Sequence, residues 1–83
     1  MAREWYFVRK LRPHERPHSL ERFEVQVLDN DGRAIAIGHL AVDARQLIIQ
    51  GHEIPLAVLE AAKRRPEGQG DYVDPSGERL PPF

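Results

Sequence analysis

The segment from Phe23 to Val42 constrains the fold of this chain more than any other. Apolar side chains occupy alternate positions on both sides of the turn-forming sequence Asp29–Gly32. Alternation with a period of two is typical of half-buried strands, and Asn, Asp and Gly favour the tight turns that join antiparallel strands. The segment therefore predicts an antiparallel β-hairpin, with strands at about 22–29 and 33–41.

Two further segments predict strands before and after this hairpin. The sequence Trp5–Val8 is rich in aromatic and β-branched residues, so we expect a strand at about 4–11. The pattern leaves open which face of that strand is buried, because both faces would carry apolar side chains. The run Leu47–Ile49 predicts a short strand that is buried on both faces or at its centre, followed by a turn at Gly51.

A helix is predicted at about 55–65. Pro55 suits its first position, where the missing N–H costs nothing, and most of the following residues are strong helix formers. Pro66 and Gly68 are typical of its end. An apolar stripe that can pack on a sheet comprises Val58, Leu59, Ala61 and Ala62. The side chains expected to be most sensitive to truncation are Leu56, Val58 and Leu59.

The C-terminal segment completes the expected fold. The sequence Asp71–Leu80 predicts a small hairpin, since Pro75 and Gly77 suit its turn. The chain is then α+β: a mostly antiparallel sheet of four to six short strands with one helix packed on one face and a short C-terminal hairpin. We expect one small domain over residues 1–83, with a Pro-containing loop at 13–19 and a tail at 81–83. Whether Leu80–Phe83 docks on its own sheet or on a partner stays open.

Composition sets limits on stability and location. A chain of 83 residues forms one domain with a thin core, so a partner that covers apolar surface would stabilise it. The chain has no cysteine, whereas small secreted domains usually depend on disulfides. It also has no apolar run typical of a membrane span or a signal peptide. We therefore expect a cytoplasmic protein that does not contact membranes.

The residues that catalysis commonly uses are scarce. Cysteine and threonine are absent, and the only serines, Ser19 and Ser76, lie in sequences typical of turns. No Gly-rich loop precedes the helix, as a phosphate site would require. The spacing of His14 and His18 would suit a metal only on a helix, and Pro17 lies between them. We therefore predict no catalytic residue, no metal site and no cofactor.

Two other histidines are the candidates for acid–base chemistry. His39 is in phase with Ile35 and Ile37, so we expect its side chain on the core face of its strand. His52 precedes Glu53, but neighbours on a strand point to opposite faces and make a poor acid–base pair. A small enzyme that uses His39 or His52 is therefore the least favoured hypothesis.

Two hypotheses of other kinds carry more weight. The first is a small non-enzymatic module that binds another protein or a second copy of itself, because its core is thin and its strands leave open edges. The alternative is a nucleic-acid-binding accessory protein that uses the basic residues of 9–16 and 63–65, although the net charge of −1 disfavours it. The residues expected to contact a partner are Trp5, Tyr6, Arg9, Lys10, Arg12, Arg16, Lys63, Arg64 and Arg65.

Overall fold

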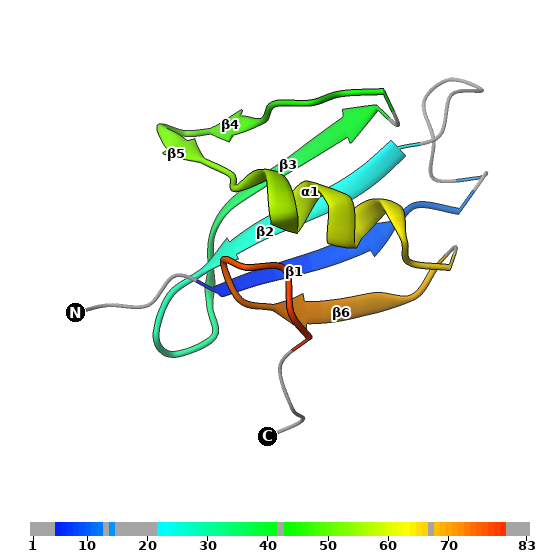
Figure 1. The fold of residues 1–83 in the computed structure, drawn as a ribbon. Helices are drawn as coiled ribbons and strands as arrows, with labels where there is room; N and C mark the ends of the chain where they lie inside the picture. Colours follow the sequence, from blue (N-terminus) through cyan, green and yellow to red (C-terminus); the bar gives the residue numbers. More distant parts are fainter. Residues whose placement is uncertain (1–4, 13, 15–21, 42, 67, 80–83) are drawn as a thin grey trace.

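The computed structural model describes residues 5–12, 14, 22–41, 43–66 and 68–79, and these residues form an α+β fold (Figure 1). Short strands precede and follow a single described helix. In chain order the elements are β1 (Trp5–Lys10), β2 (Arg22–Leu28), β3 (Ala34–Ala41), β4 (Ile48–Ile49), β5 (His52–Glu53), α1 (Leu56–Lys63) and β6 (Gly70–Val73). The predicted fold class is confirmed.

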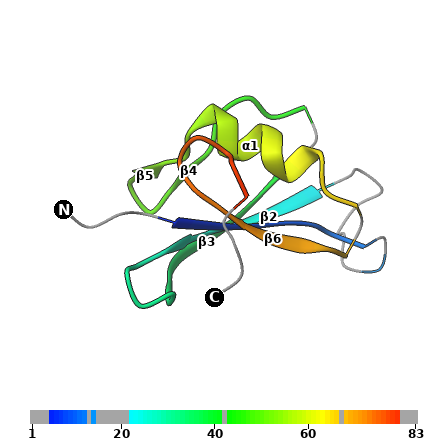
Figure 2. The ribbon, with the colours of Figure 1, turned by 60° about the horizontal axis from the view of Figure 1, so that its bottom comes forward.

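The strands form two sheets. The larger sheet has four antiparallel strands in the order β3-β2-β1-β6, and β4 pairs with β5 in a separate two-stranded sheet. Figure 2 shows α1, β4 and β5 in a layer over one face of the larger sheet. Among the described residues, no element covers the opposite face, which we call the open face.

The hairpin of β2 and β3 forms as predicted, and its turn explains why. The Oδ1 atom of Asp29 accepts hydrogen bonds from the backbone N–H groups of Asp31 (2.9 Å) and Arg33 (3.0 Å). Gly32 has φ of 80°, a left-handed conformation that glycine adopts without a steric penalty. A register shift between Val27 and Leu28 places a bulge near this turn.

The core lies between the larger sheet and α1. The central strands β1 and β2 contribute Tyr6, Val8, Phe23, Val25 and Val27, and all five are buried. This settles the question that the sequence left open, since the Tyr6 and Val8 side of β1 faces the helix. The predicted stripe on the helix is also buried, and it comprises Val58, Leu59, Ala61 and Ala62.

Four expectations about side chains and caps are wrong. Leu56 belongs to the first turn of α1, yet it lies beside the buried stripe and is 58% exposed. Ile48, expected to be buried at the centre of its strand, is 57% exposed, because of the two residues of β4 only Ile49 packs against the core. His39 is indeed in phase with its isoleucine neighbours, but that whole side of β3 lies on the open face. Pro55 is the N-cap residue rather than the first residue of the helix.

Other expectations lie outside the described residues. Apart from His14, which is exposed, the 13–19 loop is not described, and neither is the 81–83 tail. The C-terminal hairpin is described as far as Arg79, which forms a bridge to Val73. Among the described residues, no helix has the length and the apolar character that crossing a membrane requires.

The helix offers a matched test of the core. Replacing Leu59, which is 0% exposed, with alanine is expected to lower the free energy of unfolding by about 2–5 kcal/mol, because it leaves a cavity beneath the helix. Leu56→Ala, on the same helix, is expected to cost less than about 0.5 kcal/mol. Urea unfolding followed by circular dichroism measures both, and equal losses would contradict this placement of the helix.

Candidate functional site: the open face of the sheet

The open face is built from the strand positions that alternate with the core. Antiparallel pairing places Tyr72 of β6 beside Phe7 of β1, Phe7 beside Gln26 of β2, and Gln26 beside Ile37 of β3. One row of side chains thus crosses all four strands. Because α1 packs only on the opposite side, this row remains accessible, with Tyr72 46% exposed and Ile37 51% exposed.

Aromatic rings dominate one side of the open face. The rings of Phe7 and Tyr72 meet edge to face, with their centroids 5.1 Å apart and their planes at 66°, a geometry that aromatic pairs prefer. The Phe7 ring also lies over Gly70, where a Cβ atom would overlap it. Glycine at this position therefore leaves room for the end of the Phe7 ring, which also contacts Tyr72.

A hollow lies at the end of the sheet where β1 begins. Its volume is about 330 Å³, and it is open to solvent. The side chains of Trp5, Leu28 and Tyr72 give it an apolar wall, and the β2–β3 turn closes it with Asn30, Asp31 and Gly32. The hollow can accept one apolar or cationic side chain, because aromatic faces attract cations and Asp31 supplies a negative charge.

A polar row crosses the other half of the open face. Glu24 lies at its centre, with its Oε2 atom 3.5 Å from Nε of Arg9 and its Oε1 atom 3.4 Å from Nε2 of His39. The side-chain amide of Gln26 donates a hydrogen bond to Oε2 of Glu24 at 3.1 Å. Neither His39 nor His52, the two candidates for acid–base chemistry, lines the hollow beside Trp5.

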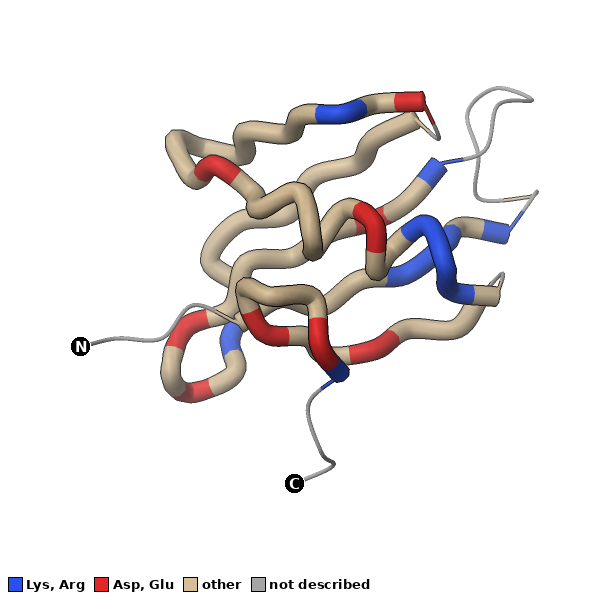
Figure 3. Tube along the Cα trace, viewed as in Figure 1, with Lys and Arg blue, Asp and Glu red and all other residues tan. Residues whose placement is uncertain are grey.

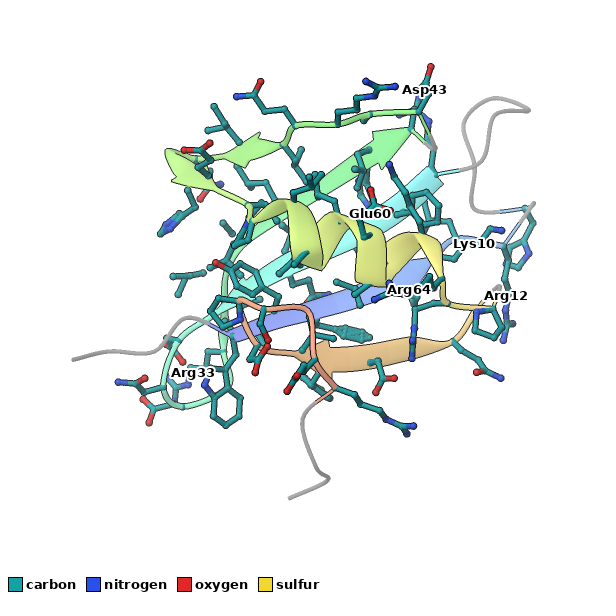
Figure 4. All side chains as sticks on the ribbon, in the orientation of Figure 1. Lys10, Arg12, Arg33, Asp43, Glu60 and Arg64 are labelled. Carbon is teal, nitrogen blue, oxygen red and sulfur yellow. The ribbon has the colours of Figure 1, made fainter. Side chains whose placement is uncertain are left out.

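The two predicted basic segments meet at the far end of the sheet. The backbone N–H of Gly68 donates to the carbonyl of Lys10 at 2.8 Å, which joins the end of β1 to the chain that follows α1. Figure 3 shows several Lys and Arg residues at this end and others elsewhere on the tube, and in the view of Figure 4 Lys10, Arg12 and Arg64 lie at the same end of the molecule. We call Lys10, Arg12 and Arg64 the basic corner.

Two further predicted basic residues, Arg65 and Lys63, contact acidic or carbonyl groups. Arg65 forms an ion pair of 2.6 Å with Asp71, and Lys63 donates to the carbonyl of Ala44 at 2.9 Å. Arg9 belongs to the polar row of the open face. Arg16 lies outside the described residues. The basic charge predicted from the sequence is thus divided among several places rather than held in one surface.

Sequence reasoning found only part of the open face. Trp5 was an expected contact residue and lines the hollow, whereas Tyr6, also expected, is a core residue with 2% exposure. Phe7 and Tyr72 are not among the expected contact residues, although their rings meet on this face. Strand alternation places Trp5 and Phe7 on one face of β1, but no local signal marked that face as the exposed one, because this depends on the side against which α1 packs.

Comparison with family models, curated proteins and solved structures gives no significant match. In the described part of the chain, no group of three or more His, Cys, Asp or Glu side chains could hold a metal ion. The open face and the basic corner are the two surfaces that bear on the function.

Replacing Gly70 with alanine tests whether Phe7 organises the open face. The added methyl group would overlap the Phe7 ring, so the ring must move and its contact with Tyr72 is lost. We expect the free energy of unfolding to fall by about 1–3 kcal/mol and the near-ultraviolet circular dichroism of the aromatic residues to change. Gln69→Ala, at an exposed neighbouring position, is the control. An unchanged aromatic signal in Gly70→Ala would contradict this arrangement.

Proposed function

We propose that this protein is a small non-enzymatic module that binds another protein on the open face of its sheet. The observation that carries the proposal is the combination of exposed Tyr72 and Ile37 with the hollow beside Trp5 on one uncovered face. Large apolar side chains that share one exposed face of a small protein commonly mark a contact with a partner. Aromatic side chains beside a hollow are also the usual anchors of protein interfaces.

The charges on this face favour a protein partner over a nucleic acid. Asp31 lies in the wall of the hollow, and Glu24 lies at the centre of the polar row. Both carboxylates would repel the phosphates of a nucleic acid whose bases stacked on Tyr72. A protein partner can instead place a basic or apolar side chain against Trp5, where the aromatic rings and Asp31 both favour it.

A pair of variants tests the open face. Tyr72→Asp places a charge on the open face, whereas Ile48→Asp places the same charge at a similarly exposed apolar position on β4. In affinity capture from nuclease-treated lysate of the native host, the wild type and Ile48→Asp are expected to retain the same proteins and Tyr72→Asp to lose them. Circular dichroism confirms that each variant is folded. Identical captured sets for the two variants would contradict the proposal.

The basic corner supports a second candidate, a nucleic-acid-binding accessory protein. Lys10 is the last residue of β1, Arg12 follows it closely, and Arg64 directly follows α1, so residues distant in sequence place cations at one end of the molecule (Figure 4). Phosphate contacts from such clusters give binding that depends strongly on salt. This candidate uses a surface different from the open face, so the two proposals can be tested separately.

Charge reversal at the basic corner tests this second candidate. We expect the Arg12→Glu/Arg64→Glu variant to weaken binding of a fluorescent single-stranded RNA by at least about tenfold, because two phosphate contacts are replaced by repulsion. Arg33→Glu, which alters an exposed arginine at the opposite end of the sheet, should have little effect. Fluorescence anisotropy at low salt measures the affinity. Equal losses in both variants, or no binding by the wild type, would remove the candidate.

A further inference from the structure

Strand β3 forms an edge of the larger sheet, and its outer side lacks a backbone partner among the described residues. β2 pairs with β3 along its whole length on the inner side. The chain that follows β3 turns back beside it, but β4 pairs with β5 instead. Ile49 packs over Gly38 from the helix side. The backbone N–H of Ala44 donates a hydrogen bond to the carbonyl of Ala41, which closes the turn that follows β3.

At the opposite edge of the sheet, β6 has features that hinder pairing with another chain, whereas β3 lacks them. β6 is short, carries Asp71, and is flanked by the bridge between Val73 and Arg79. Short length, charge and a covering turn are common ways to prevent edge strands from pairing with other chains. β3 has eight residues, AIAIGHLA, with no proline and no Lys, Arg, Asp or Glu.

We propose that β3 pairs antiparallel with β3 of a second copy of this chain, about a two-fold axis at Gly38. The pairing joins the two four-stranded sheets into one continuous sheet. It also places the two open faces on the same side of the dimer. Because the contact uses the strand edge rather than the open face, this inference goes beyond the proposed function and does not depend on it.

The charges at the two ends of β3 support this partner and this register. Arg33 precedes the strand and Asp43 follows it; both are exposed, and Figure 4 shows them at opposite ends of β3. They are equidistant in sequence from Gly38. Antiparallel pairing centred on Gly38 therefore brings Arg33 of each copy to the end where the other copy carries Asp43.

The side chains within the strand are compatible with the same register. Ile37 of one copy comes opposite His39 of the other on the open face, and Ala36 comes opposite Leu40 on the helix side. Each pair lies on one face, because the pairing preserves the alternation of the strand. Ile37 then loses part of its exposure to water. A single strand pair buries less surface than a standard stable interface, so we expect a weak dimer with a Kd of about 10–500 µM.

Analytical ultracentrifugation of the full chain with charge-swap variants tests the pairing. Arg33→Asp and Asp43→Arg are each expected to raise the dimer Kd by about tenfold, since two like-charge contacts replace two opposite-charge ones. The double variant Arg33→Asp/Asp43→Arg restores the opposite charges and should return the Kd to about the wild-type value. Arg64→Asp makes the same change of charge far from β3 and should leave the Kd unchanged.

Hydrogen exchange at low and high protein concentration locates the interface independently of any variant. Amides of β3 are expected to exchange more slowly as concentration rises, whereas those of β6 should not change. A wild type that stays monomeric at millimolar concentration overturns the inference. A dimer in which the amides of another element exchange more slowly also overturns the inference. The same holds if the double variant Arg33→Asp/Asp43→Arg does not restore the Kd. Tyr72→Asp should leave the Kd unchanged, so a failed dimer and a failed open-face partner give different results.

Discussion

The packing of α1 against β1 and β2 decides which side of every strand is buried. Val58 and Leu59 are fully buried, and the strands beneath them must present Val8 and Val25 toward the helix. The helix has eight residues and is therefore only about 12 Å long. It can seal one face of a four-stranded sheet, and no described element seals the other. The apolar residues on that second face are a direct consequence of a sheet with a single covering layer.

Antiparallel register then determines what the uncovered face contains. Phe7 and Tyr72 are far apart in the sequence, yet the pairing of β1 with β6 brings their rings into contact. The Phe7 ring also covers Gly70, so it contributes to the packing of the sheet as well as to the exposed surface. Under the proposed pairing of β3, two such faces would lie on the same side of one sheet. A partner with two contact sites could then bind both copies with a gain from avidity.

Local patterns predicted the elements well and the exposure of single residues less well. The β2–β3 hairpin was predictable because the Asp29 side chain and Gly32 define its turn within a few residues. Leu56 and Leu59 are chemically identical and lie in one helix, but only Leu59 falls within the buried stripe. Of the candidate site, Trp5 was predicted and Tyr72 was not, because its exposure depends on long-range strand pairing.

The sequence by itself determined the strands, the turn and the helix, because alternation, turn chemistry and helix propensity act over a few neighbouring residues. It also determined that His39 shares a face with Ile37. Only the tertiary structure decided that this face is the exposed one, since that depends on the side of the sheet against which α1 packs. It also decided that β3 is an edge strand, because strand order arises from contacts between segments distant in the chain.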